Sequence, residues 1–559
     1  MSNKEVNQFD IDAVVEKFYI SLFQREEGQL FALEKEQSEA LQEAQEEANK
    51  EISELEEKLQ ELKDAEKSAE NKGLIKKQKS KIKAARRSAK ARDRLIKAEF
   101  KPRLKKIRQI LKVARGRADI LKKARYNEFK AWQKAGFEDI ENRPSEIEKL
   151  RFDSYKPELV ENDVVLSVRH LKQYFESGFG ANKLRTKAVH DISFDIHNGE
   201  VFGLVGESGC GKTTTGRSII RLYDITSGSI YFKGHRISGG TRWNEKEIKW
   251  KRIRLRQEIK ELKAKMKEEL DDAEAIDEDV TEARSEQIKD HYNKKIAAIE
   301  YEIDEIVRVQ KTKIKLIRYD NKNYDEEFMS QIQMIFQDPT DSLDPRMTVE
   351  DAIQEGLQIQ GYRNKAANSN KVSDVLDQVG LLPEYASRYP HEFSGGQRQR
   401  IGIARAIVMQ PEFMICDEPV SALDVSIQAQ VINLLSDLRD EMGLTLLFVA
   451  HDLSLVKYFC DRIAVMYFGR IVELATSEDL FANPLHPYTK SLISAIPKPD
   501  PISEKARKRI HYNPAEAHNY AEEGNPTLTE ITPGHFVLAN EVELERYRKE
   551  IEDRTKSKK

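Results

Sequence analysis

The sequence predicts an α/β protein that carries long, charged helical additions. From about residue 163, short β-rich runs such as DVVLSVRHL and ISFDIHNGEVFGLVG are punctuated by glycine, as expected of strands separated by turns. Before that point, and again at about 242–325, apolar residues recur with helical spacing among many charges. Charged residues make up 34% of the 559-residue chain, yet the net charge is only −3. Several domains with segments of opposite charge are therefore expected.

The N-terminal part predicts an antiparallel helical hairpin. Residues 26–70 are strongly acidic and place apolar residues at heptad positions, namely Leu41, Ala48, Ile52, Leu55, Leu59, Leu62 and Ala69. Residues 74–134 are strongly basic and repeat the helical spacing with Leu104, Ile107, Leu111, Ala114, Ala118 and Leu121. The NKG segment at 71–73 is a turn signal, and Pro102 is expected to kink or restart the second helix. Complementary charge and an apolar seam would then join the two arms.

Composition also predicts the remaining boundaries. We expect the hairpin and a linker at 1–150, an α/β core at 151–482 and a C-terminal region at 483–559, with AGFEDIENRPSEIEKLRFDSYKPE as the linker. A helical insertion at about 242–325 would turn near DDAEAIDED, each arm extending ~40–55 Å. The tail from 498 is polar apart from TLTEITPGHFVL.

Several classes of protein are excluded by absent signals. The longest apolar runs fall far short of the roughly 20 residues that a membrane-spanning helix needs, and the N-terminus lacks a signal-peptide pattern. The three cysteines, Cys210, Cys416 and Cys460, have no metal or disulfide spacing. We therefore expect a cytoplasmic protein with reduced thiols.

A phosphate-binding loop is the strongest motif in the core. The segment VFGLVGESGCGKTTTGRS reads as a buried strand, a glycine-rich loop and a helix start, and it satisfies G-x-x-x-x-G-K-[ST]. Backbone N–H groups of such a loop cradle phosphates, while Lys212 reaches the β and γ phosphates and the Thr213 hydroxyl ligates Mg²⁺. The predicted nucleotide-binding residues of the loop are Gly206, Glu207, Ser208, Gly209, Cys210, Gly211, Lys212, Thr213 and Thr214.

Three further strands are predicted to deliver polar side chains to the same edge of the sheet. PEFMICDEP ends in two carboxylates, of which Asp417 can order the metal through its water shell and Glu418 can polarise the attacking water. LTLLFVAHD delivers His451, which can contact the γ-phosphate, and IFQDP delivers Gln337, which can touch Mg²⁺ or the water. Ligands bind at the carboxyl ends of strands in open α/β sheets, which favours a catalytic interpretation over an ordinary acidic loop or structural histidine.

A second anion site is suggested by EFSGGQRQRIGIARA, where Ser394, Gly395, Gly396 and Gln397 precede and open a helix. With FQDP, MICDE, SALD and the histidine after a strand, this order resembles the ATP-binding cassette (ABC) ATPases over about residues 163–480, excluding the insertion. Phe393 stands where leucine is usual, at a position expected to pack. The resemblance implies a P-loop NTPase fold with a RecA-like core, an antiparallel β subdomain and a helical signature subdomain at about 341–408.

The resemblance also implies how the site is completed. Two cassettes pair head to tail, so that the signature residues of one close on the ATP held by the other. Asp424 of SALD would lie at the dimer seam, and Gln337 would couple the site to a membrane partner. An adenine-stacking aromatic residue usually lies upstream of the phosphate loop; Phe175 is favoured and Tyr174 is second, although either is equally compatible with an ordinary strand position.

The C-terminal region resembles that of peptide importers. NPLHPYTKSLISAIP at 483–497 and TLTEITPGHFV look like segments of this group, and the core motifs resemble its F-type ATP-binding subunit. The resemblance implies an ATPase using ATP and Mg²⁺ on the cytoplasmic face of a bacterial membrane. Implied partners are a D-type ATPase subunit, two permeases and an external peptide-binding protein. No cysteine follows Cys460, so the iron–sulfur site of some relatives is not expected.

Two rival interpretations come from the helical additions. Basic residues such as Arg86, Arg87, Arg92 and Arg94 suggest an RNA-bound translational cassette ATPase, but those proteins usually carry two cassettes. A chromosome-maintenance ATPase would have a far longer coil placed after the glutamine loop, whereas this insertion precedes FQDP. No nucleic-acid partner is therefore expected.

Overall fold

The computed structural model describes residues 11–64, 69–137, 143–178, 184–274, 281–338, 342–362, 364–497 and 509–557. The chain divides into two compact units. The first contains the residues up to Arg151 together with Ala297–Thr312, and the second contains Phe152–Ile296 and Lys313–Lys559.

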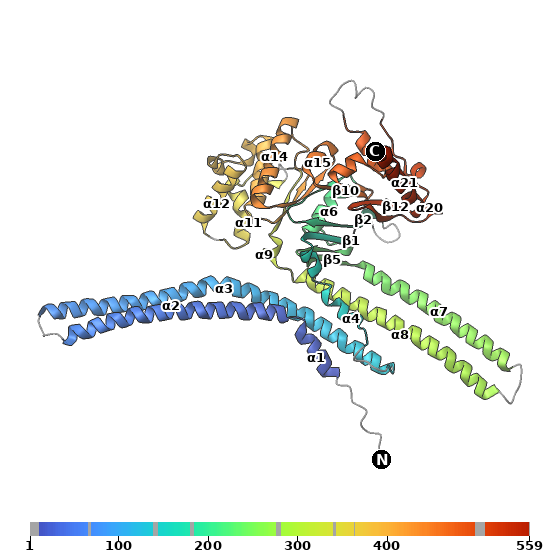
Figure 1. Ribbon diagram of the computed structural model, residues 1–559, viewed down its shortest axis with the longest axis horizontal. Coiled ribbons are helices and arrows are strands. Elements are labelled where there is room, and N and C mark those ends of the chain that lie inside the picture. The colour runs from blue at the N-terminus through green and yellow to red at the C-terminus, as the bar shows by residue number, and fades with distance from the viewer. Residues whose placement is uncertain are drawn as a thin grey trace, which may run out of the picture. The chain divides into compact units, whose positions relative to one another are not determined.

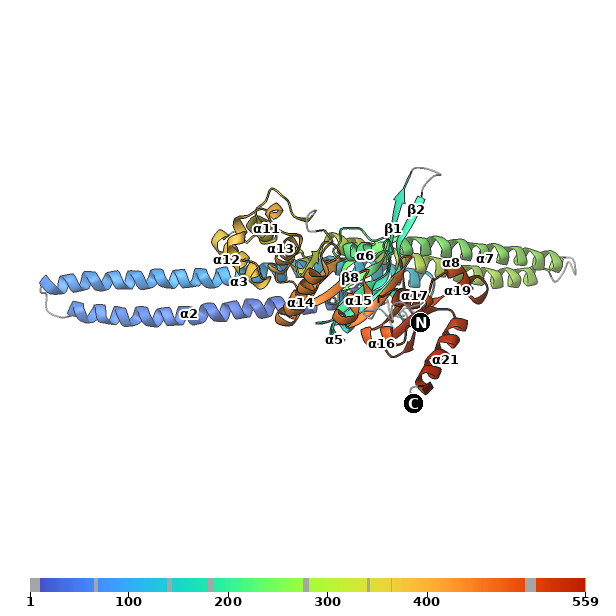
Figure 2. The ribbon, with the colours of Figure 1, turned by 90° about the horizontal axis from the view of Figure 1, so that it is seen from above.

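The first unit is built on the predicted antiparallel hairpin. Its acidic arm is α2 (Gln24–Asp64) and its basic arm is α3 (Ala69–Lys134), preceded by α1 (Ile11–Ser21). Figures 1 and 2 both show α2 and α3 side by side. Ion pairs such as Arg86–Glu56 at 2.7 Å and Arg115–Glu27 at 2.9 Å join late residues of one arm to early residues of the other. The antiparallel arrangement is confirmed.

An apolar seam runs between these arms, as predicted. Every predicted seam position whose side chain is described is buried or half-buried, with Leu33, Phe100 and Leu104 forming one cluster along it. Ala69 lies outside the described side chains. Exposed ion pairs contribute only ~0–1 kcal/mol each, so this seam supplies most of the stabilisation.

One local prediction for the hairpin, the turn at residues 71–73, is wrong. Residues 71–73 lie inside α3, which begins at Ala69, so they form no turn. A glycine within a helix costs only about 1 kcal/mol relative to alanine, which the extended packing of α3 offsets. Of the two alternatives predicted at Pro102, a kink or a restart of the helix, the restart does not occur, because α3 continues through Pro102 with Phe100 and Leu104 buried on both sides.

The segment predicted as a linker is folded where it is described. Residues 138–142 lie outside the described residues, but α4 (Glu146–Lys149) and the 3₁₀ turn Leu150–Phe152 follow. Ile147 is 1% exposed. The buried Arg125 of α3 pairs with Glu128 at 2.6 Å and Glu148 at 2.8 Å. Residues 143–150 are therefore packed onto the end of the hairpin rather than forming a spacer.

The second unit contains the α/β core with two sheets. The antiparallel sheet has the order β2-β1-β4-β5, and the larger sheet has the order β11-β12-β10-β9-β3-β8-β7-β6, of which β9-β3-β8-β7-β6 are parallel. The strands of the antiparallel sheet are β1 (Val164–Ser177), β2 (Leu184–His197), β4 (Ser227–Phe232) and β5 (His235–Thr241). Those of the larger sheet are β3 (Val201–Val205), β6 (Ile332–Ile335), β7 (Phe413–Asp417), β8 (Thr445–Ala450), β9 (Arg462–Tyr467), β10 (Arg470–Thr476), β11 (Thr527–Thr532) and β12 (His535–Ala539).

The inner parallel strands β3, β7 and β8 are central in the sheet and mostly apolar. All residues of β3, β7 and β8 are buried, as expected when helices cover both faces of a sheet. A helical layer around Ile353, Val372 and Ile401 shares one hydrophobic core with them. The helices of this part are α6 (Lys212–Ile219), α9 (Glu326–Met329), α11 (Val349–Ile359), α12 (Lys365–Gln378), α13 (Gly395–Ile407), α14 (Val425–Met442) and α15 (Leu453–Phe459). Short helices also occur at Pro157–Glu161 (α5), Pro383–Ser387 and Pro390–Glu392.

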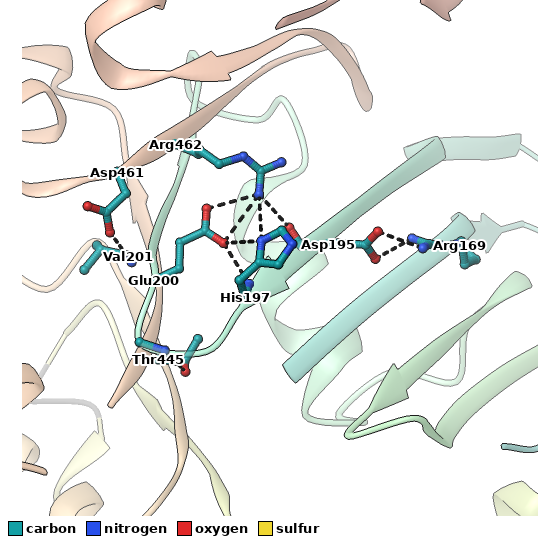
Figure 3. A network of polar contacts seen from close by, with 9 residues as sticks. Arg169, Asp195, His197, Glu200, Val201, Thr445, Asp461 and Arg462 are labelled. Atoms are coloured by element: carbon teal, nitrogen blue, oxygen red, sulfur yellow. Dashed lines mark hydrogen bonds and ion pairs between the residues drawn. The ribbon is translucent and has the colours of Figure 1, made fainter. Parts of the chain in front are cut away.

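A polar network fixes the start of β3, the strand that leads into the phosphate loop (Figure 3). The Glu200 carboxylate accepts a hydrogen bond from the His197 backbone at 2.7 Å and pairs with Arg462 at 3.1 Å. Asp461 accepts a bond from the Val201 amide at 2.8 Å. Thr445 likewise accepts one from the Gly199 amide at 3.0 Å. Strand β3 is thereby held between β8 and β9.

The insertion is helical, as predicted, and consists of α7 (Arg242–Glu274) and α8 (Thr281–Lys322). The predicted turn near DDAEAIDED falls partly on residues 275–280, outside the described residues. At the end of α8, the buried Arg236 of β5 ion-pairs with Asp320 at 3.3 Å, and Asn321 exchanges two hydrogen bonds with the Gly239 backbone. The insertion is therefore anchored to the edge of the antiparallel sheet.

The C-terminal region adds to the large sheet. The predicted apolar cluster TLTEITPGHFVL forms β11 and β12, and β12 pairs with β10. The helices of this region are α16 (Ser477–Ala482), α17 (Pro487–Ser494), α19 (Pro514–Ala517), α20 (Tyr520–Glu523) and α21 (Glu541–Ser557). Within the residues that the structure describes, no helix is both long and apolar enough to cross a bilayer.

Candidate functional site

The phosphate loop leaves the carboxyl end of β3 and runs into α6. Its glycines are required by geometry: Gly206 has φ +151° and Gly211 has φ +111°. A Cβ on Gly206 would lie 2.2 Å from the Met466 carbonyl oxygen, and one on Gly211 would lie 2.3 Å from that of Ala188. No other residue can follow this path, because both the conformation and the space exclude a side chain.

The Lys212 side chain is buried, and its ammonium group turns back toward the loop backbone. Its Nζ donates to the Gly206 carbonyl at 2.7 Å and to the Glu207 carbonyl at 3.1 Å. The same atom lies 3.9 Å from Oε1 of Glu418. The ammonium group is thus held at the mouth of the loop, between backbone carbonyls and a carboxylate.

Thr213 and Asp417 meet at the point where β7 ends. The Thr213 hydroxyl donates to Oδ1 of Asp417 at 2.9 Å, and Oδ2 of this fully buried carboxylate has no hydrogen-bond partner. Burial raises the pKa of Asp417, while the bond from Thr213 opposes that rise. A buried carboxylate oxygen without a donor is a place where a cation or its bound water would be stabilised.

These residues fit Mg²⁺, which keeps several waters and takes few protein ligands. In the described ranges, no three His, Cys, Asp or Glu side chains gather to hold a metal by themselves. A hydroxyl and one carboxylate beside a phosphate loop would instead suit a metal that arrives together with a phosphate ligand. Gln337, the third predicted ligand, faces Glu418 rather than Asp417.

Glu418 stands at the centre of the predicted catalytic residues. Its Oε2 accepts a hydrogen bond from Gln337 Nε2 at 3.2 Å and lies 3.1 Å from His451 Nδ1. Glu418 has φ +46°, a left-handed conformation that costs a non-glycine residue about 1–2 kcal/mol. Such strain recurs at functional sites, where the surrounding structure enforces it. The three strand ends therefore converge as the sequence predicts.

One cleft of about 560 Å³ joins these groups. Its lining contains most of the predicted phosphate-site residues, namely Gly206, Glu207, Ser208, Gly209, Gly211, Lys212, Thr213, Thr214, Gln337, Glu418 and His451. Cys210 is buried in the loop and does not line the cleft. All three cysteines are free, as predicted. Sequence reasoning missed Ala188 and Leu492, which also line the cleft and carry no local signal.

Neither candidate for adenine stacking lines this cleft. Phe175 is 38% exposed and packs edge-on against Tyr223 with ring centroids 5.2 Å apart. Tyr174 is half-buried, and its hydroxyl is hydrogen-bonded to His190. Phe175 is therefore the more exposed of the two rings.

The signature residues lie outside the cleft. Ser394 caps α13 in a reciprocal capping box with Gln397, and its side chain is exposed. A Cβ on Gly396 would lie 2.6 Å from Ile427, so the helix start packs tightly against α14. Asp424 is exposed just before α14, next to Val425, which is 82% exposed. Phe393 is buried against Tyr385, as expected of a packing residue.

Family models match two parts of the chain. The model described as "ABC transporter" matches residues 189–319 and 295–421. The model described as "Oligopeptide/dipeptide transporter, C-terminal region" matches residues 472–524.

Curated proteins are similar over nearly their whole length. "Oligopeptide transport ATP-binding protein OppF" of Bacillus subtilis is 45% identical over 384 residues, which span 68% of this chain and 98% of that protein. The protein of the same name from Streptococcus mutans is 43% identical over 69% of this chain and 97% of its own length. "Dipeptide transport ATP-binding protein DppF" of Lactococcus lactis is 42% identical over 70% of this chain and 99% of its own length.

Proposed function

Since this chain belongs to the family of oligopeptide and dipeptide ABC transporter ATP-binding proteins, we propose that it hydrolyses ATP to power peptide uptake across a bacterial membrane. One observation carries the assignment of the site. Glu418 at the end of β7 shares a cleft with the phosphate loop and reaches within 3.9 Å of Lys212 Nζ. A general base and a phosphate-binding cation are thus side by side.

Each side chain has a distinct role in this proposal. The loop amides and Lys212 bind the β and γ phosphates, because N–H groups and an ammonium complement their charge. Glu418 accepts the proton of the attacking water, and Gln337 and His451 hold its carboxylate in the cleft. Thr213 and Asp417 would hold Mg²⁺, which supplies charge neutralisation at the phosphates. Phe175 would stack on the adenine.

The nucleotide site is proposed to be completed by a second ATPase subunit. Ser394, Gly395 and Gly396 do not line the cleft of their own chain, and Ser394 and Asp424 are exposed. The positive end of α13 is then available to the γ-phosphate held by a partner. We favour a heterodimer with a D-type subunit, and a homodimer remains an outcome of the test below.

Two permeases and a peptide-binding protein are the other proposed partners. A hollow on the core is lined mainly by apolar residues, which include Ile220, Met334, Phe336 and Gly402, together with the polar residues Gln333, Ser342, Gln399 and Arg405. Phe336 directly precedes Gln337, and Gly402 lies on the signature helix. A permease segment in this hollow would therefore sense both parts of the nucleotide site. The proposed location of the subunit is accordingly the cytoplasmic face of the membrane.

The RNA-bound alternative is not supported. Arg86 and Arg92 of the basic arm are paired with Glu56 and Glu47 of the acidic arm, at 2.7 and 3.7 Å. The related proteins named above are transport proteins.

Affinity purification of the tagged full-length chain from solubilised membranes tests the proposal. We expect permeases, a peptide-binding protein and a second ATPase subunit in the complex, with peptide-stimulated ATP hydrolysis. Recovery of ribosomes or nucleic acid without permeases would overturn it. Recovery of only this ATPase with the permeases would replace the heterodimer by a homodimer.

A further inference from the structure

The C-terminal region reaches the phosphate loop through one tyrosine. Tyr488, the second residue of α17, is 2% exposed, and its hydroxyl accepts a hydrogen bond from the Glu207 amide at 3.1 Å. Leu492, one turn later on the same helix, lines the nucleotide cleft. The segment that carries both residues lies well outside the phosphate-loop motif.

A buried carboxylate positions the start of this helix. Glu473 of β10 is fully buried and accepts hydrogen bonds from the backbone amides of Leu485 at 2.8 Å and His486 at 2.9 Å. His535 of β12 binds the same carboxylate at 2.8 Å. The His486 ring in turn accepts a bond from the Tyr488 amide at 3.1 Å. The backbone around Tyr488 is therefore held by groups from two strands of the main sheet.

The ring of Tyr488 is packed as firmly as its backbone. Its centroid lies 4.4 Å from that of Tyr467 and 5.5 Å from that of Tyr512. Tyr467 ends β9, which pairs with β3, the strand that leads into the loop. A tyrosine hydroxyl is neutral near neutral pH, and burial raises the pKa of Tyr488 further. A neutral, fixed hydroxyl is a dependable acceptor for the Glu207 N–H.

The peptide group between Gly206 and Glu207 is therefore held from both sides. Its N–H, that of Glu207, is bound by Tyr488, and its carbonyl, that of Gly206, accepts from Lys212 Nζ at 2.7 Å. If the tyrosine hydroxyl is removed, this N–H loses its partner and the carbonyl that orients Lys212 becomes free to move. A lysine that must reach the β and γ phosphates then starts from a less ordered position.

We propose that Tyr488 is a positioning residue of the phosphate loop, through which the C-terminal region sets the affinity for ATP. This inference rests on the proposed ATP binding at the cleft. Tyr488 touches only the backbone of the loop, so it should affect nucleotide affinity more than the hydrolysis step.

The test compares Tyr488→Phe with Tyr512→Phe in the full-length chain. Tyr512 belongs to the same aromatic cluster, but its hydroxyl faces His518 at 3.0 Å rather than the loop. We expect ATP affinity to fall about five- to tenfold in Tyr488→Phe, as for a lost hydrogen bond to a buried group, and to be unchanged in Tyr512→Phe. In the assembled transporter, KM for ATP should rise by a similar factor with kcat within about twofold of the wild type.

Thermal unfolding without nucleotide separates the outcomes. Equal ATP affinity in the two variants overturns the inference. A lower Tm of Tyr488→Phe together with unchanged ATP affinity also overturns it, because that result would mean that Tyr488 has a purely structural role. Wild-type chain and Lys212→Ala serve as reference proteins. If the wild type fails to bind ATP, or Lys212→Ala binds it equally well, the proposed nucleotide site fails independently of Tyr488.

Discussion

Replacing Glu418 by glutamine should separate ATP binding from ATP hydrolysis. The amide has nearly the volume of the carboxylate and can keep contacts with Gln337 and His451, which lie 3.2 and 3.1 Å from Oε2. It cannot accept a proton from water. The change therefore removes the proposed general base while leaving the shape of the cleft intact.

Two effects set the expected changes in turnover and in ATP affinity. A positioned general base contributes roughly 10²–10⁴-fold to rate, so turnover should fall by about that factor, or ~3–5 kcal/mol in the barrier. The second effect concerns binding, because Glu418 lies 3.9 Å from Lys212 Nζ. At an effective dielectric constant of about 20, that attraction is on the order of 4 kcal/mol before hydration offsets part of it. Its removal frees Lys212 for phosphate, so ATP affinity should be retained or increase.

The assay is single-turnover hydrolysis of ATP by the complete transporter, with ATP affinity measured in parallel. Lys212→Ala is the matched control, since it should lose affinity instead of turnover. Near-normal hydrolysis by Glu418→Gln would refute its role as the base. A loss of ATP binding in this variant would refute the inference that its carboxylate competes with phosphate for Lys212.

Four other perturbations test other parts of the molecule. Ser394→Ala should lower ATP turnover in the complete transporter without changing ATP affinity of the isolated chain, since Ser394 is proposed to act on a partner's nucleotide; reduced affinity in the isolated chain would contradict this. Trp132→Ala, at a fully buried position, should destabilise the first unit by ~3–5 kcal/mol in chemical unfolding. ATP affinity should stay the same in this variant. It should also stay the same after deletion of residues 1–150. A weakened ATP affinity in either case would link the first unit to the nucleotide site. Burial, with the nearby His518 and Lys490, lowers the pKa of His486 to about 3, so only the unfolded chain takes up this proton as pH falls below about 6.5. Between pH 6.5 and 5, the wild type should therefore lose up to ~1.4 kcal/mol of unfolding free energy per pH unit relative to His486→Asn. The same pH dependence of urea unfolding in the wild type and the variant would contradict a lowered pKa of His486.

The sequence by itself determined the elements whose signals are local. The phosphate loop follows from glycines that must adopt positive φ beside a buried strand, as Gly206 and Gly211 do. The strand ends at Glu418 and His451 follow from apolar runs that stop at a polar residue. The hairpin of α2 and α3 follows from heptad spacing and opposite charge. In each case the deciding interactions lie within a few residues of each other, or repeat along the chain.

Only the tertiary structure decided the features that depend on distant partners. The glycine signal at 71–73 is local, but packing along the whole of α3 prevails over it. Tyr301 of α8 packs on Phe137 near the end of the hairpin, with ring centroids 5.0 Å apart, and no periodicity links these two positions. The bond from the Glu207 amide to Tyr488 joins residues 281 positions apart. Such pairings are fixed by the folding of the complete sheet, because a buried hydrogen bond depends on where two chain segments meet and not on the composition of either one.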